Sequence, residues 1–436
     1  MKKSLFVFVG AFLFLAAGSA FAGGTHESHA AAALTTAKTQ IVLAVGPRGF
    51  GNAAPYLIQG FMKTHPNIDV KWLKISDVPN VSLSFYVTNF SAGNPTPDVA
   101  ATDIILTGDF AQHGWIAPVN PYFTAQQIAK YNPDFIRAAT VKGKVYGVPL
   151  YEDGTHLFYR TDLLKKYGFQ PPKTWEELVQ EAQAITAGEH NPELVGYTSM
   201  WAKIEGLFMD WLSFFYGDGG TFFTANGKVN VDSPQGLKAM QTMYDFIYKY
   251  KIANNGILTS RPNDAEILFR EKRAVFMVVQ DFVWPPLTAS DSPVRNDVNF
   301  TRVPYFAGHP TAHSTAIGGF ILSINAHSKH KAAAAELIRY FTDYQSQLHS
   351  ALTADRGPTL PGVYNDALLK QQNPVLAKLG ADYAVGVFRP SARTGTQYPQ
   401  VSEIMQEQIS AALNRVETPA QAMKTAQQQI TALLQN

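Results

Sequence analysis

Carboxylates and aromatic rings occur together at the ends of several strands that the sequence predicts. These residues are Asp103, Tyr151, Asp153, Trp284 and Phe320. A carboxylate accepts hydrogen bonds from two neighbouring hydroxyl groups, and a flat ring packs against the C–H face of a sugar. The combination therefore favours a binding site for a neutral polyol. Taken singly, each residue is also compatible with a cap or with a place in the core.

Signatures of catalysis are scarce in the sequence. There is no cysteine, no G-x-S-x-G elbow, no G-x-x-x-x-G-K-[ST] loop and no H-E-x-x-H pair. The eleven histidines include His309 and His313, but no set at firm zinc-ligand spacing. We therefore predict a protein that is not an enzyme and holds no metal or cofactor. An exported glycoside hydrolase stays open as an alternative, in which Asp103, Asp153 and Glu205 would supply two carboxylates about 5 to 9.5 Å apart.

The start of the chain has the pattern of a signal peptide. Two lysines precede an apolar run, LFVFVGAFLFLAAG, which ends in Ala-Phe-Ala at residues 20–22. We predict cleavage after residue 22, and the small polar residues at 23–39 predict a flexible lead-in. Since the cleavage point offers no cysteine for a lipid, an outer membrane would have to retain the protein, and we predict a periplasmic location.

The charge balance bears on the partners of the protein. The full chain carries 36 Lys+Arg and 34 Asp+Glu residues, and removal of residues 1–22, with two lysines and no acid, leaves 34 of each. A neutral chain gives no support to a partner that attracts basic surfaces, such as nucleic acid or an anionic membrane. We therefore expect no nucleic-acid partner.

The apolar pattern predicts an α/β fold. At about 100–200 residues per domain, a chain of 436 residues forms two or three lobes with sizeable cores. From residue 41 the chain alternates between strand and helix, with IVLAV at 41–45, a helix whose apolar face lies at 56–61, and a strand at 68–73. A further strand, PDVAATDIIL, lies between helical stretches near Phe85 and Phe110.

The alternation of predicted strands and helices ends after residue 142. Two extended runs are predicted to join near Asp153-Gly154, and Thr174 with Glu177 forms a capping box that opens a helix. Residues 200–290 are predicted to be mainly helical; strands return at 298–304 and 319–324, and helices follow at 332–344, 401–413 and after 418. If the late strands join the first sheet, the chain crosses between lobes more than once and forms a hinge of several strands.

Two long strings carry a resemblance to a known family. PDVAATDIILTGDFAQHGWIAPVNPYF and GKVYGVPLYEDGTHLFYRTDLLKKYGFQPPKTWEEL resemble stretches of the extracellular solute-binding proteins of carbohydrate ABC importers (family 1). The first has PDV, an Asp-bearing strand and a G-W-x-x-P turn. The second has the G-K-x-Y-x-x-P, Y-R-x-D-L-L and P-P-x-T-W-x-E-L signatures. The similarity runs nearly from Ile41 to the C-terminus, and it is greatest to the trehalose/maltose-binding proteins.

The resemblance implies a two-lobed periplasmic-binding-protein fold of type II, in which hinge strands join the lobes around a ligand cleft. It implies a first lobe at 40–150 plus about 304–342 and a second lobe at about 151–303 plus 343–436. It also implies a monomer that encloses a neutral sugar by hinge closure and delivers it to the membrane permease of an ABC importer. The sugar would be a disaccharide such as trehalose or maltose, or a smaller sugar or polyol.

The resemblance further implies a set of ligand-binding residues. These are Asp103, Tyr151, Asp153, Trp284, Gly319, Phe320, Arg389, Gln280, Asn52 and Arg48. Gln280 stands where the trehalose/maltose subgroup has a stacking Trp, Phe282 replaces a Tyr, and the Arg expected before Phe85 is absent. These departures make a smaller sugar or a polyol a rival to a disaccharide. A binding protein for a peptide, a metal or a phosphate ester is a further alternative, and Arg389 with Arg393 keeps the phosphate ester open.

Overall fold

The computed structural model of the chain describes residues 38–50, 53–77 and 79–435. The predicted signal peptide at 1–22 and almost all of the predicted lead-in at 23–39 lie outside these residues. Within the described residues, no helix is long and apolar enough to cross a membrane.

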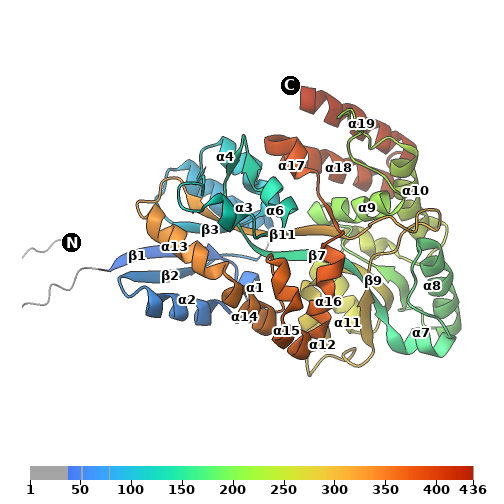
Figure 1. Cartoon of the computed structure of the whole chain (residues 1–436). Coiled ribbons are helices and arrows are strands. Elements are labelled where there is room, and N and C mark those ends of the chain that lie inside the picture. The colour runs from blue at the N-terminus through green and yellow to red at the C-terminus, as the bar shows by residue number, and fades with distance from the viewer. Residues whose placement is uncertain (1–37, 51–52, 78, 436) are drawn as a thin grey trace, which may run out of the picture. The chain divides into compact units, whose positions relative to one another are not determined.

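Ten strands of the described part form one mixed sheet (Figure 1). Its main path is β2-β1-β3-β11-β7-β9-β8, with β10 paired to β7, and with β4 and β12 paired to β11. The strands are β1 Thr39–Val45, β2 Ile68–Lys74, β3 Val99–Asp103, β4 Ile116–Ala117, β7 Val148–Arg160, β8 Val195–Thr198, β9 Ala274–Gln280, β10 Val298–Thr301, β11 Ala316–Asn325 and β12 Val387–Phe388. A separate small pair consists of β5 Thr140–Val141 and β6 Lys144–Val145.

The sheet has two regions, which correspond to two lobes. The first sheet region contains β2, β1, β3, β4, β11 and the start of β7, and its helices are α1 Pro47–Phe50, α2 Ala53–Thr64, α3 Pro79–Ser91, α4 Thr107–Gln112, α5 Ala125–Ile128, α6 Pro133–Ala138 and α13 Lys331–Phe341. In β1, Leu43 packs in a cluster with α2 and α13, whereas Ala44 packs in another cluster with Tyr86 of α3. Helices therefore cover both faces of the strand, as expected for a buried parallel strand.

The second sheet region contains the end of β7 with β10, β9 and β8. Phe276 of β9 faces a cluster formed with α8 Trp175–Glu189, α9 Glu205–Gly217, α10 Pro234–Tyr248, α18 Tyr398–Leu413 and α19 Pro419–Gln435. The next residue, Met277, faces a cluster formed with α11 Pro262–Arg270 and α12 Trp284–Thr288. The remaining helices are α7 Thr161–Tyr167, α14 Tyr344–Ala354, α15 Ala367–Gln372, α16 Pro374–Tyr383 and α17 Ser391–Thr394, with single 3₁₀ turns at η1 Ile104–Leu106, η2 Asn255–Thr259, η3 Asp281–Val283, η4 Pro361–Asn365 and η5 Gly395–Gln397.

Strand β7 belongs to both regions (Figure 1). Its first half pairs with β11, ending at Gly154 opposite Ile317, and its second half pairs with β9 from Thr155 opposite Gln280. The sequence predicts two extended runs that join near Asp153-Gly154, and the structure has a single continuous strand there. The amide of Gly154 donates to a side chain of the second region, Asp281 Oδ2 at 3.2 Å, so Gly154 marks a change of partner and not a turn.

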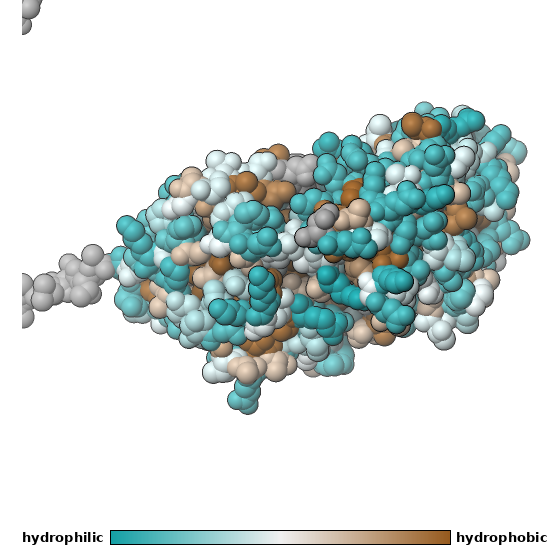
Figure 2. Space-filling model, turned by 90° about the horizontal axis from the view of Figure 1, so that it is seen from above, coloured by the Kyte–Doolittle hydropathy of each residue, from teal (hydrophilic) through white to brown (hydrophobic). Residues whose placement is uncertain are grey.

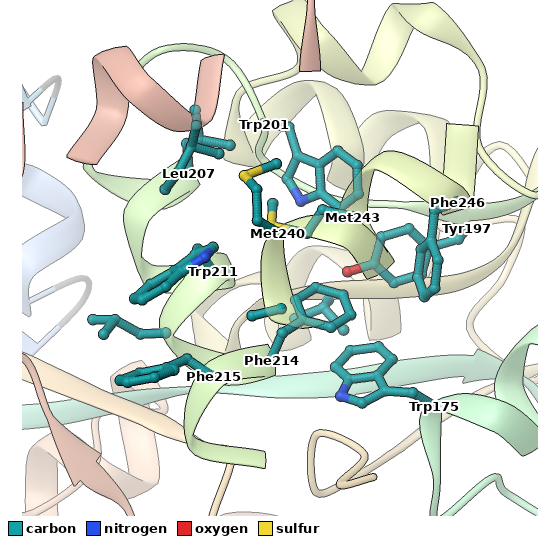
Figure 3. Close-up of a cluster of buried hydrophobic side chains, with 14 of the residues drawn as sticks. Trp175, Tyr197, Trp201, Leu207, Trp211, Phe214, Phe215, Met240, Met243 and Phe246 are labelled. Atoms are coloured by element: carbon teal, nitrogen blue, oxygen red, sulfur yellow. The ribbon is translucent and has the colours of Figure 1, made fainter. Parts of the chain in front are cut away.

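The second sheet region holds a large aromatic core (Figure 3). Trp175 at the start of α8 stacks on Phe214 of α9 with ring centroids 4.0 Å apart, and both lie near Phe246 of α10. The predicted capping box positions Trp175, because the Glu177 amide donates to Thr174 Oγ1 at 3.1 Å and the Thr174 amide donates to Glu177 Oε2 at 3.0 Å. The aromatic residues of 200–250 thus serve mainly as core.

The surface is of mixed character. In the face seen in Figure 2, hydrophobic residues form separate patches among hydrophilic ones. Large exposed hydrophobic side chains of the described residues come from distant elements, such as Tyr56 of α2 and Val416 after α18. The helix predicted at 332–344 ends at Phe341, and α14 begins after Asp343, whose side chain accepts from the amide of Ser346 at 2.7 Å and caps the new helix.

Candidate functional site

Three adjacent strands bring several predicted site residues into one row. Asp103, the last residue of β3, lies opposite Phe320 of β11, and Phe320 lies opposite Tyr151 of β7. Two residues further along the two strands, Gly318 of β11 lies opposite Asp153. Because side chains alternate along a strand, Tyr151 and Asp153 point to the same face of the sheet. The register thus places the predicted acids and rings at one end of β3, beside the crossing strands.

The ring of Tyr151 is part of a packed layer. It stacks on Phe320 with centroids 5.1 Å apart and planes at 20°, and the guanidinium carbon of Arg356 lies 5.2 Å from its centroid. Tyr151 is buried, whereas Phe320 keeps part of its surface exposed. Gly319, which precedes Phe320 in β11, has φ 146, and a β-carbon there would lie 2.3 Å from the Tyr151 carbonyl oxygen. Glycine is therefore required at this position by the backbone itself.

Arg389 connects the first sheet region to the second. Its Nη2 lies 2.8 Å from Asp103 Oδ1, and its Nη1 lies 3.2 Å from Glu205 Oε1 at the start of α9. Glu205 also accepts from the hydroxyls of Tyr398 and Ser402 on α18. Burial opposes the positive charge, but the neighbouring Asp103 and Glu205 raise the pKa of Arg389 above its usual value. We call Asp103, Arg389, Glu205, Tyr398 and Ser402 the arginine cluster.

Asp103 has a structural contact in addition to the arginine. Its Oδ1 accepts from the amide of Ile105 at 3.2 Å, and it caps the short turn η1. The sequence left open whether Asp103 caps a turn or binds a ligand; the structure shows the cap, and the ligand contact stays a prediction.

A second group of acids surrounds the point where β7 changes partner. Asp281 in η3 accepts from the amide of Gly154 and from the hydroxyl of Tyr383 of α16. Burial raises the pKa of Asp153 to about 6, with a further increase from Asp103 that Arg389 and Arg356 only partly offset. Burial, followed by the charge of Asp153, also raises the pKa of Asp281 well above its usual value. We call Asp153, Asp281 and Tyr383 the hinge cluster.

Asp281 and Tyr383 are not among the site residues predicted from the sequence, and Glu205 is predicted only as an acid of the alternative hydrolase. Asp281 directly follows the end of β9, so the pattern of an acid at a strand end could have identified it. Tyr383 and Glu205 carry no such signal, because they reach the site from helices whose packing the sequence does not specify.

Gln280 and Trp284 lie in the second sheet region. Gln280, at the end of β9, points its Nε2 to Met209 Sδ at 3.5 Å, and its Oε1 is buried without a hydrogen-bond partner among the described residues. Trp284 opens α12 and packs edge-on against Phe300 at 5.1 Å. Asn52 lies outside the described residues; the backbone of Arg48 is part of α1, but its side chain is not described.

A pocket of about 160 Å³ is lined by Ile104, which follows Asp103 in the chain, and by residues that include Ile105, Gly108, Ser391 and Gly395. Among the residues that the structure describes, no group of three or more His, Cys, Asp or Glu side chains could hold a metal ion.

Comparison with known proteins identifies the class to which this fold and site belong. The chain matches the bacterial extracellular solute-binding protein family over residues 47–348 and belongs to this family. The family resemblance seen in the sequence is thereby confirmed, as is the two-lobed α/β fold.

Individual relatives cover most of the chain. A probable ABC transporter-binding protein of Deinococcus radiodurans is 30% identical over 370 residues, 84% of this chain and 86% of the relative. The structure of maltose-bound T. maritima MalE3 has a TM-score of 0.83 and 31% identity, and covers 91% of this chain and 100% of its own. A solute-binding protein of Thermotoga lettingae bound with alpha-D-tagatose has a TM-score of 0.79 and 25% identity, and covers 92% and 100%. The Deinococcus radiodurans and Thermotoga lettingae relatives are thus described as binding proteins of ABC transporters.

Proposed function

We propose that this protein captures a neutral, hydroxyl-rich solute in the periplasm and delivers it to the permease of an ABC importer. The solute is a disaccharide such as trehalose or maltose, or a smaller sugar or polyol. The predicted lobes, 40–150 plus about 304–342 and about 151–303 plus 343–436, bind it between them as a monomer. The known binders of maltose and of tagatose among the relatives support this ligand class.

One observation carries the proposal: the strand register aligns Asp103, Phe320 and Tyr151, next to Asp153 and to Arg389. Carboxylates, a guanidinium and a partly exposed ring together offer hydrogen-bond acceptors, donors and a flat apolar face, which is what a sugar needs. Asp103 and Phe320 belong to the first predicted lobe, and Tyr151, Asp153 and Arg389 belong to the second. A solute among them therefore bonds to both lobes only when these are closed. Such a solute shifts the population toward the closed form.

The arrangement around Glu205 speaks against the glycoside hydrolase. Its two oxygens accept from Arg389, Tyr398 and Ser402. A carboxylate engaged on both oxygens is poorly placed to donate a proton to a glycosidic oxygen or to attack a sugar carbon.

A thermal-shift screen tests the ligand class. Maltose, trehalose, tagatose, glucose and ribitol are added separately at millimolar concentration to the chain without residues 1–22. A ligand that binds only the folded protein stabilises it by RT ln(1 + [L]/Kd), about 2.7 kcal/mol at one hundred times Kd. We expect at least one of these compounds to raise the melting temperature, and a comparison of disaccharides with monosaccharides sets the size of the site.

A matched pair of variants localises any binding that the screen detects. Asp153→Ala should weaken binding by about 2 kcal/mol, because it leaves ligand hydroxyls without an acceptor. Asp291→Ala, at an exposed position after α12, should leave the affinity unchanged. Absence of a shift with every compound would sink the carbohydrate assignment, and equal affinities for the two variants would remove Asp153 from the site.

A further inference from the structure

A second pocket lies on the β10 side of the fold. Its volume is about 290 Å³, and three parts of the chain line it. These are 172–173 before α8, residues 301–303, 305 and 310–315 from the end of β10 to the start of β11, and residues 382, 385 and 386 at and after the end of α16. The last two segments lead directly into β11 and β12, which pair with each other at Ala316 and Val387. A molecule in this pocket would therefore contact the two segments through which the chain returns to the first sheet region.

The basic groups of the pocket outnumber its acids. Lys173, Arg302 and His313 line it together with one carboxylate, that of Asp382. Arg302 binds Asp382 through Nε, whereas Lys173 and His313 have no ion-pair partner in the described part of the chain. Both of these side chains are exposed and can turn toward a ligand.

Neighbouring acids outside the pocket are already engaged by backbone amides. Glu177 Oε2 accepts from the amides of Lys173 and Thr174 at 2.7 and 3.0 Å, and Glu176 Oε2 accepts from the amide of Ala307 at 3.2 Å. These acids hold the loop, and they leave the side chains of Lys173 and His313 for another anion.

The pocket is connected to the crossing strand through a buried histidine. His156 of β7 is fully buried, and its Nε2, which has no hydrogen-bond partner among the described residues, lies 3.7 Å from Asp382 Oδ2. Its Nδ1 lies 3.1 Å from the Gly154 carbonyl oxygen and 4.0 Å from Asp281 Oδ2. Asp382, His156 and Asp281 thus form a continuous polar line from the pocket to the hinge cluster.

We propose that this pocket binds a small phosphate-bearing anion through Lys173, Arg302 and His313, and that its occupancy is coupled to closure around the sugar. Guanidinium, ammonium and imidazole groups together with the hydroxyls of Thr311 and Thr315 provide the donors that phosphate oxygens require. A bound anion shares Arg302 with Asp382, and this changes the charge that faces His156 on β7. The coupling rests on the proposed sugar binding; the anion site does not.

Calorimetry on the protein without sugar tests the anion site. Inorganic phosphate and glycerol 3-phosphate are titrated separately, against sodium chloride of equal ionic strength. We expect saturable binding with a Kd in the millimolar range or below, and a loss of about tenfold or more, roughly 1.4 kcal/mol, in the double variant Lys173→Ala/His313→Ala. Lys130→Ala, which removes an exposed lysine outside the pocket, should bind as the wild type does. Tighter binding of glycerol 3-phosphate would identify a phosphorylated metabolite as the occupant; equal binding would identify free phosphate.

Two results would overturn the anion site: no saturable binding of either compound, or equal binding by the double variant and the wild type. The coupling is tested by repeating the sugar titration with phosphate present. Because coupling between two ligands is reciprocal, each must change the affinity of the other by the same factor. Unchanged sugar affinity would refute the coupling alone, and a failure of every sugar to bind would refute the proposed function without affecting the phosphate result.

Discussion

The arginine cluster and the hinge cluster differ in the groups that bind their buried carboxylates. In the arginine cluster, Asp103 and Glu205 share the guanidinium of Arg389, at 2.8 and 3.2 Å. In the hinge cluster, Asp281 is bound by the Tyr383 hydroxyl and the Gly154 amide, which are neutral donors. A cation thus binds the acids of the first cluster, whereas neutral groups bind Asp281 in the second.

The difference determines what each cluster does as conditions change. A carboxylate paired with arginine stays ionised and fixes its partner in space. A buried carboxylate near a second acid holds a proton more readily, and burial together with Asp103 raises the pKa of Asp153 to about 6, although Arg389 and Arg356 act in the opposite direction. The arginine cluster therefore fixes the two sheet regions against each other, and the hinge cluster makes the crossing of β7 sensitive to pH.

Removal of the guanidinium should have the largest effect. Arg389→Ala leaves Asp103 and Glu205 without their cation, and we expect a loss of about 3 kcal/mol in the free energy of unfolding, the low end for buried pairs, because each acid keeps about a quarter of its side chain exposed. Denaturant unfolding measures the change. Arg393→Ala, in the same segment, removes a guanidinium that lies over Phe223 at 4.4 Å and should cost less than about 1 kcal/mol. Similar losses in both variants would show that Arg389 does not balance the two acids.

Loss of the Asp153 carboxylate should have an intermediate effect on stability. The pH dependence of this effect distinguishes the hinge cluster from the arginine cluster. Since the folded pKa of Asp153 is raised from 3.8 to about 6, the folded state binds more protons than the unfolded state in this range, and stability falls as the pH rises from about 4 to about 6. Asp153→Asn abolishes that fall. The stability of the variant relative to the wild type should therefore increase over the same interval and then level off. Urea unfolding at several pH values from 4 to 8 measures it.

Asp162→Asn serves as the matched control with the opposite sign. Burial acts against ionisation of Asp162, but the hydrogen bonds and charge of Arg160, with Nε at 2.7 Å, lower its pKa. The stabilisation from ionised Asp162 is present above about pH 4 and is lost as the pH falls through its lowered pKa. Asp162→Asn should thus be destabilising at neutral pH. If the two variants change stability in the same direction near pH 7, the contrast between paired and unpaired acids does not hold.

Much of the fold could be predicted from local pattern. The apolar run at 41–45 gave a buried strand because both of its faces are covered, and the Thr174–Glu177 box gave the start of α8 because a cap depends on four neighbouring residues. The extent of β7 could not be predicted. Gly154 breaks the pattern of a strand locally, and only the distant partners β11 and β9 show why the strand continues.

The candidate site was predictable to the extent that it lies on strands. Asp103, Tyr151 and Phe320 come together because register fixes which residues are opposite each other. Glu205, Tyr398 and Tyr383 lie on helices, and their approach depends on how α9, α18 and α16 pack, which short-range spacing does not encode. The binding roles of all these residues stay predictions until a ligand is tested.

Substitution of Gly108, which lies close to Gly395, should have the smallest effect on stability. It also tests whether the arginine cluster and the hinge cluster act separately. A β-carbon at Gly108 of α4 would lie 2.6 Å from the carbonyl carbon of Gly395 and 2.8 Å from its oxygen. Gly108→Ala should therefore push α4 away from the 391–395 segment that follows Arg389, at a cost of about 1 kcal/mol. Gly308→Ala is the control, because a β-carbon there meets nothing within 4 Å. Since the arginine cluster joins these two sides, Gly108→Ala should weaken sugar binding about fivefold, whereas the hinge cluster, held along β7, should keep its pH dependence. A change of both the affinity and the pH profile in Gly108→Ala would mean that the two clusters respond as one unit and that the division between them is wrong.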